Sequence, residues 1–193
     1  MSAARIALVG ALVAALAAAS TACSVVPPAP PLPALFDFGL ASAPAAPGGA
    51  PAAAQVAAPP WLDGTAMLYR LAYGDGSRLA SYRDSRWASP PAALLQERLK
   101  QRLARATGTA SASTLRVEVE EFSQVFETPT RSRAVVRMRA ALLEADTGRV
   151  LRQQAFAEDV AAASADAQGG ARALVQASDA ALARVIDWAA ATR

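Results

Sequence analysis

Three consecutive segments in the second half of the chain have the residue pattern of β-strands, and this feature constrains the fold most. The segments cover residues 114–126, 132–145 and 149–160. Only short turns separate them: residues 128–130 read Thr-Pro-Thr, and residues 146–148 read Asp-Thr-Gly. Because strands joined by such short turns pair antiparallel, the three segments predict an antiparallel meander.

The first hairpin of this meander predicts which side chains face the core. If it folds about Thr128–Thr130, Glu120 lies opposite Arg139 on the solvent face. The glutamates and arginines of that face then form cross-strand pairs. The same acids could instead supply a carboxylate pair for glycosidic chemistry, and we favour the cross-strand pairs. The core face collects the apolar residues Leu115, Val117, Val119, Val136, Met138, Ala140 and Leu142.

The residues before the meander predict three shorter strands. They are expected at residues 34–39, 53–62 and 67–73. The last is the clearest, because its large residues alternate with small or polar ones. The residues that share one face of this strand are Met67, Tyr69, Leu71 and Tyr73.

Two segments have the period of amphipathic helices. One follows Ser89, which is positioned to cap it, and stops at Gly108. The other covers residues 164–191 and contains Gly169 and Gly170. These glycines indicate a late helix start or a local kink rather than a ligand site. Together with the strands, the helices predict an α+β fold: an antiparallel sheet with two amphipathic helices packed on one face.

The absence of histidine excludes several classes of catalytic site. The chain has no His and a single Cys, Cys23. Ser-His-Asp and Cys-His nucleophile systems, and most catalytic zinc sites, need residues that it does not have. We therefore expect no enzyme activity, no cofactor and no metal site. The net charge is only +3, without a basic stripe carrying interleaved aromatics, so we expect no nucleic-acid partner.

The first 22 residues have the organisation of an export signal. Arg5 gives a positive start, residues 6–19 form an uninterrupted apolar stretch, and residues 20–22 are small. Cys23 follows directly. The segment resembles a bacterial lipoprotein signal, although position 20 is Ser where that pattern usually has Leu. An ordinary secretory signal, with the Cys there by coincidence, is the alternative.

In the lipoprotein interpretation, Cys23 is the lipidation site. Its thiol carries a diacylglycerol and its amine an acyl chain, and several chains together give a stable anchor. Ser24 favours the outer membrane, since lipoproteins with Asp at that place tend to stay on the inner one. Residues 23–33 form a stiff tether, because five of them are proline. Such a tether could hold a domain about 30 Å from the bilayer.

The stretch YRDSRWASPP, residues 82–91, and its flanks resemble a known protein family. The stretch follows the strand MLYRLAY and leads into a Leu-rich helix. This run resembles the ABC-type transport auxiliary lipoproteins, the PqiC-like family, and the resemblance covers roughly residues 34–193. It implies a non-enzymatic lipoprotein of the cell envelope, which Ser24 would place on the periplasmic face of the outer membrane. It also implies an MCE-domain (MlaD-like) partner of an ABC transporter that carries phospholipid or another hydrophobic substrate between the membranes.

The residues of this stretch have both a structural and a functional interpretation. Trp87, two residues before the expected cap, is placed to pack over the first turn of the helix. Asp84 can pair with Arg83 or Arg86. As partner-binding residues we expect Tyr82, Arg86 and Trp87, since Tyr, Trp and Arg dominate interface hot spots. Both interpretations hold if Trp87 is buried while Tyr82 and Arg86 point outward.

Two other functions stay open beside that of an adaptor. A lipid-binding carrier would need an apolar pocket between the helices and the sheet, where the Ala-rich helix faces could leave room. The second is an outer-membrane assembly lipoprotein resembling LptE of the lipopolysaccharide translocon, which also pairs helices with a sheet. A homo-oligomer is compatible with each of them.

Overall fold

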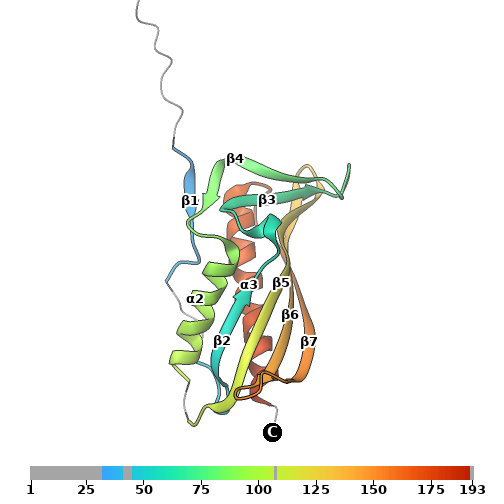
Figure 1. The fold of residues 1–193 in the computed structure, drawn as a ribbon. Coiled ribbons are helices and arrows are strands. Elements are labelled where there is room, and N and C mark those ends of the chain that lie inside the picture. The colour runs from blue at the N-terminus through green and yellow to red at the C-terminus, as the bar shows by residue number, and fades with distance from the viewer. Residues whose placement is uncertain (1–31, 41–44, 107, 192–193) are drawn as a thin grey trace, which may run out of the picture. The chain divides into compact units, whose positions relative to one another are not determined.

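The computed structural model describes residues 32–40, 45–106 and 108–191 (Figure 1). The chain from Pro33 onward forms one compact unit, which we call the body. The expected signal segment, Cys23 and most of the proline-rich tether lie outside the described residues. Their lipidation and anchoring therefore stay predictions.

The described residues form a seven-stranded sheet and two long helices, which confirms the α+β prediction (Figure 1). Among the described helices, none is long and apolar enough to cross a membrane. The elements follow one another as β1 (Ala34–Phe36), β2 (Pro51–Ala57), a short 3-10 helix (Pro60–Leu62), β3 (Ala66–Leu71), β4 (Leu79–Trp87), α2 (Pro91–Ala104), β5 (Ser111–Thr128), β6 (Arg131–Glu144), β7 (Val150–Ala161) and α3 (Ala167–Ala190).

The sheet is mixed rather than wholly antiparallel. Its strand order is β1-β4-β3-β5-β6-β7, and β2 also pairs with β5. Strands β5, β6 and β7 form the predicted antiparallel meander. However, β1 runs parallel to β4, and β2 and β3 run parallel to β5. The parallel pairing of β3 with β5 arises because β4 and α2 lie between them in the chain, and parallel neighbours need such a long connection.

The sequence pattern predicts no strand at residues 79–87, and this is wrong, because β4 occupies all of them. Arg83 and Asp84 are exposed where the pairing of β4 with β3 is interrupted. These two adjacent charges break the alternation of apolar and polar residues that indicates a strand. The strand is held by pairing with β3 on one side and with β1 on the other. Its existence therefore depends on partners distant in sequence rather than on a local apolar period.

Two irregularities in β5 correct the predicted hairpin register. Next to the turn, Thr128 pairs with Arg131, as the turn prediction requires. Two bulges further along β5 then shift the pairing by one residue each. Arg139 consequently lies opposite Glu118, and the predicted direct pairing with Glu120 is wrong. The predicted ion pair nevertheless forms, since Arg139 Nη2 lies 2.8 Å from Glu120 Oε1.

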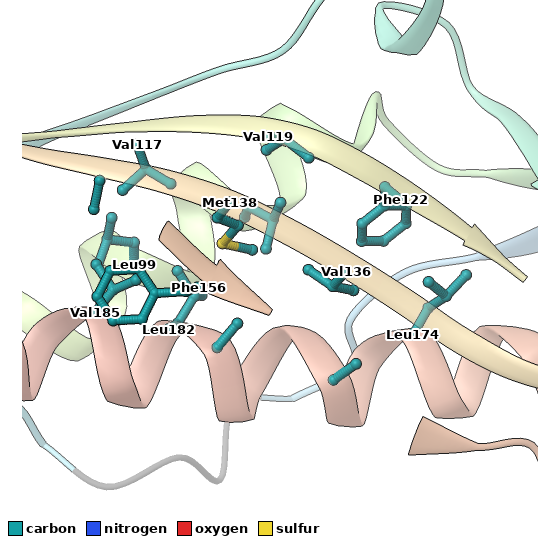
Figure 2. Packing of buried hydrophobic residues seen from close by; sticks show 14 of the residues in the cluster. Leu99, Val117, Val119, Phe122, Val136, Met138, Phe156, Leu174, Leu182 and Val185 are labelled. Atoms are coloured by element: carbon teal, nitrogen blue, oxygen red, sulfur yellow. The ribbon is translucent and has the colours of Figure 1, made fainter. Parts of the chain in front are cut away.

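The bulges preserve the predicted core face. Odd-numbered residues of β5 are buried on the N-terminal side of the second bulge, and even-numbered ones such as Phe122 are buried beyond it. Figure 2 shows this face packed toward α3, with Leu99 of α2 close to Leu182 and Val185 of α3 and to Phe156 of β7. Both helices therefore contribute to one core.

Helix α2 begins at Pro91, and the predicted Ser89 cap is wrong. Pro90 is the N-cap, and no side chain accepts a hydrogen bond from the first turn. Instead the N–H groups of Ala93 and Leu94 donate to the Pro90 carbonyl, at 2.9 and 3.1 Å. Because Pro91 has no N–H, the first turn has fewer donors that need a cap.

Gln96 of α2 covers the outer edge of β2. Its side-chain oxygen accepts a hydrogen bond from Val56 N–H at 2.7 Å, and its amide donates to the Ala54 carbonyl at 3.1 Å. These two bonds take the place of a neighbouring strand. The helix therefore closes the centre of this edge.

The glycine pair lies in the first turn of α3, which confirms the late helix start. Asp166 caps the helix by accepting from Gly169 N–H at 2.7 Å. A Cβ on Gly170 would lie only 1.9 Å from Gln124 Oε1, and a Cβ on Gly169 would lie 2.2 Å from the Ser164 carbonyl oxygen. Gly170 therefore allows α3 to approach β5 closely, and Gly169 leaves room for the segment that leads into the helix.

Candidate interaction site

Three aromatic rings meet where β4 ends, and we call them the aromatic cluster: Phe38, Trp87 and Phe122. The Phe38 and Trp87 rings lie 6.0 Å apart, the Trp87 and Phe122 rings 5.5 Å, and the Phe38 and Phe122 rings 6.3 Å. These separations fall in the favourable range for aromatic pairs. Trp87 is 1% exposed, so its predicted burial is confirmed and its ring is not available to a partner in this structure.

Backbone hydrogen bonds fix the end of β4 from two sides. Trp87 N–H donates to the Thr65 carbonyl at 2.8 Å, and Ala88 N–H donates to the Phe36 carbonyl at 2.7 Å. Phe36 belongs to β1, whose register sets it beside Trp87. The segment that leads in from the N-terminus is thus joined directly to the strand before α2.

Two buried arginines of α2 connect the aromatic cluster to α3. Arg98 stands 5.7 Å from the centre of the Phe38 ring and donates to the Phe38 carbonyl. Its Nε also lies 3.4 Å from Asp179 Oδ1. Arg102 Nη1 donates to the Asp179 carbonyl at 2.9 Å. Burial lowers the pKa of Arg102, and the charge of Asp179 opposes this shift. We call Arg98, Arg102 and Asp179 the arginine bridge.

Tyr82 points its hydroxyl into the core, which corrects the expectation that it faces outward. The hydroxyl donates to Gln124 Oε1 at 2.9 Å, and Gln124 Nε2 donates to Ser132 Oγ at 2.7 Å. The ring also lies 5.0 Å from that of Tyr69. Burial raises the pKa of Tyr82 to about 12, and the negative charge of Asp166 adds to the shift.

Arg86 and Asp84 make local contacts only. The guanidinium of Arg86 donates to the Tyr82 and Ser85 carbonyls, and the residue is half-buried. Of the two predicted partners of Asp84, the structure selects Arg83, with Arg83 Nη2 3.1 Å from Asp84 Oδ2. The structure therefore brings Tyr82, Arg86 and Trp87 together on one strand but does not present them as one exposed patch.

The exposed end of the β3–β4 hairpin is a surface that the sequence interpretation missed. Leu71 is 36% exposed and Tyr73 is 50% exposed. Figure 1 shows the hairpin at the same end of the sheet as the β5–β6 turn. The sequence did indicate this surface: the apolar residues on one face of β3 begin at the buried Met67 and continue to the exposed Leu71 and Tyr73. A recess of about 280 Å³ lies here, lined by Tyr69, Leu71, Asp75, Arg78 and Ala80.

A groove of about 510 Å³ lies between the segment that leads into β2 and the last turns of α2. Its lining is mainly glycine, alanine and proline, with Leu103 as the largest apolar residue. Lys100, the only lysine of the chain, stands at the groove. Among the described residues, this groove rather than the packed core offers space to an apolar molecule.

Two solvent-face glutamates of β5, Glu120 and Glu127, pair with arginines of β6, as predicted, and an aspartate of β7 also pairs with arginines of β6. Asp159 lies 2.9 Å from Arg133 Nη1 and 2.5 Å from Arg137 Nη1. The hydrogen bond from Arg137 holds the pKa of Asp159 below its usual value. Arg133 also contacts Glu127, at 3.2 Å. Within the described ranges no group of three or more metal-ligating side chains occurs.

Comparison with known families gives one match over most of the body. The family described as the ABC-type transport auxiliary lipoprotein component matches residues 39–190. Among proteins with curated descriptions, none matches the chain.

Solved structures share the fold at low sequence identity. A Xanthomonas campestris protein of the DUF330 family superimposes with a TM-score of 0.67 at 19% identity, over 80% of this chain and 93% of that one. An uncharacterized protein superimposes with a TM-score of 0.60 at 17% identity, over 82% of this chain and 99% of that one. At these identities the likeness concerns the fold alone.

Replacing Trp87 with Ala should lower the free energy of unfolding by about 3–5 kcal/mol, because the ring fills the centre of the aromatic cluster. Trp87→Phe, which keeps an aromatic ring, should cost less. Trp61→Ala is the matched control, since that ring is exposed. Denaturant unfolding measures all three. An unchanged midpoint for Trp87→Ala would contradict the burial and return Trp87 to the partner surface.

Tyr82 should make stability depend on alkaline pH. Its pKa rises from 10.0 to about 12 on folding, so the folded state holds the proton more tightly. The stabilisation is complete below about pH 10 and is lost as the pH rises toward 12. Tyr82→Phe should therefore flatten the loss of stability across this range, whereas Tyr73→Phe, at an exposed position, should not. Denaturant midpoints at a series of pH values would disprove the account if Tyr82→Phe kept the wild-type slope.

Proposed function

Because the chain belongs to the family of ABC-type transport auxiliary lipoprotein components, we propose that it acts as an adaptor of such a transport system and not as an enzyme. The lipid on Cys23 anchors it to the periplasmic face of the outer membrane. Its partner is the MCE-domain (MlaD-like) protein of the transporter, and the substrate is phospholipid or another hydrophobic molecule. The family match over residues 39–190 is the observation that carries the proposal.

The arrangement of the body supports an adaptor role. The aromatic cluster fixes the end of β4 in the core, and the arginine bridge links this cluster through α2 to α3, so the β3–β4 hairpin has a rigid base. Leu71 and Tyr73 are exposed on this hairpin. Large aromatic side chains and arginine supply most of the energy in protein interfaces. We place the partner contact on the hairpin and along β4 to Arg86, with Tyr82 and Trp87 supporting the strand from the core side.

Co-purification with the MCE-domain protein tests this contact. The Leu71→Ala/Tyr73→Ala variant removes exposed side chains and should reduce recovery of the partner at least about tenfold, since hot-spot losses exceed about 1.4 kcal/mol. Arg86→Ala should reduce it as well. Trp61→Ala is the control and should leave recovery unchanged, because this exposed ring lies outside the hairpin.

Circular dichroism first establishes that each variant is folded. Equal recovery of the partner with Leu71→Ala/Tyr73→Ala and with Arg86→Ala would remove the hairpin and β4 from the interface. If wild-type protein instead recovers components of the lipopolysaccharide translocon, the LptE-like alternative gains support.

One observation favours a second candidate, the lipid carrier. The expected pocket between helices and sheet is occupied by side chains (Figure 2). The groove of about 510 Å³ falls within the range of small-molecule sites, about 300–1,000 Å³. Lys100 at the groove suits an anionic headgroup. A phospholipid retained by gently purified protein in native mass spectrometry would favour this function over a pure adaptor.

A further inference from the structure

The outer edge of β7 is the longest open strand edge in the described part of the chain. β7 has twelve residues, and no described strand pairs with its outer side. The other edges are shorter or covered: β1 has three residues, and Gln96 closes the centre of β2. An open edge is a template for a further strand, and proteins often protect it with proline or lysine. β7 contains neither, and it contains no glycine.

The hydrogen-bonding groups of this edge can be assigned. Ala162 N–H, just after β7, donates to the Ser132 carbonyl at 2.9 Å. Because the two sides of a strand alternate, the even-numbered residues of β7 bond to β6 and the odd-numbered ones face the open edge. The Ala157 carbonyl agrees, since it accepts from Arg184 Nη1 of α3 at 3.2 Å. A carbonyl oxygen has two lone pairs, so this bond leaves room for a strand partner.

The side chains of β7 complement those of a second β7. If two copies run antiparallel with Ala155 facing Ala155, Arg152 of each copy lies opposite Glu158 of the other. The charge pairs occur at non-hydrogen-bonded positions, where cross-strand side chains are closest. Moving the centre by one residue separates Arg152 from Glu158. Within each copy these residues also contact Trp188 and Arg184, so the charges across the pair add to existing contacts and favour this register.

Helix α3 leaves room for such pairing. It packs over both β6 and β7 (Figure 1). Neighbouring strands lie about 4.8 Å apart. With each α3 axis midway over its β6 and β7, the two helices would lie about 10 Å apart, which is an ordinary packing distance. A helix separation of this size is compatible with pairing of the two strands.

We propose that β7 pairs antiparallel with β7 of a second copy of this chain, about a two-fold axis at Ala155, so that the two sheets become continuous. The N-terminal segment of the same chain is a poor competitor for the edge, because its five prolines have no N–H to donate. A pair would carry two sets of lipid chains, which strengthens attachment to a membrane. The inference does not depend on the identity of the transport partner.

A disulfide trap tests the register. In the proposed pair the two Cα atoms at position 155 lie about 5.5 Å apart, which suits a disulfide. Ala157 is the matched control: it is also an exposed alanine of the same face. Because position 157 faces Gln153 of the second copy, the two Cα atoms at position 157 lie roughly 14 Å apart.

Full-length Ala155→Cys, Ala157→Cys and wild-type chains are treated with a mild oxidant in isolated membranes. We expect a disulfide-linked dimer of Ala155→Cys, joined at position 155 of both copies by peptide mass spectrometry. Ala157→Cys and the wild type, which controls for Cys23, should stay monomeric. Equal crosslinking of both variants, or none with Ala155→Cys, would overturn the proposal.

A charge exchange provides a second test in the Ala155→Cys background. Arg152→Glu or Glu158→Arg alone sets like charges opposite each other and should remove most of the crosslinked band, and the double exchange should restore it. Glu158 also contacts Arg184, and Arg152 stacks on Trp188, so circular dichroism must show folded variants. A band that survives both single exchanges would contradict the register.

Discussion

The rest of the body depends on the contact of Phe38 with Trp87 and Phe122. The three rings come from the segment after β1, the end of β4 and the middle of β5, so one contact fixes three parts of the chain that are distant in sequence. Arg98 lies over the Phe38 ring and extends the contact through Asp179 to α3. Removing the Phe38 ring would take away the aromatic face on which Arg98 lies and loosen the backbone carbonyl to which it donates, and a buried charge that loses partners is costly.

This contact explains what the family-like stretch does. Residues 82–91 form the end of a strand and the start of a helix, and the most distinctive residue among them, Trp87, belongs to the core. The segment after β1 reaches the core at Phe38, beside the end of β4.

The sequence predicted those helices and strands whose apolar residues repeat regularly within one segment. The meander, its core face from Leu115 to Leu142, and α3 follow from alternation and helical spacing within single segments. β4, the parallel strands and the bulges did not follow, because each depends on partners distant in sequence. At the candidate site, burial of Trp87 could be predicted from its place before a helix. The inward hydroxyl of Tyr82 could not, since its acceptor Gln124 lies on another strand.

Amide hydrogen exchange at Ala88 tests the central claim, that Phe38 locks the incoming segment to the strand before α2. The Ala88 N–H donates to the Phe36 carbonyl at 2.7 Å, so its exchange reports whether β1 is held in place. The account predicts slow exchange at Ala88 in the wild type and much faster exchange in Phe38→Ala, while amides of β6 keep their protection. Fast exchange at Ala88 in the wild type, or an unchanged rate in Phe38→Ala, would contradict it.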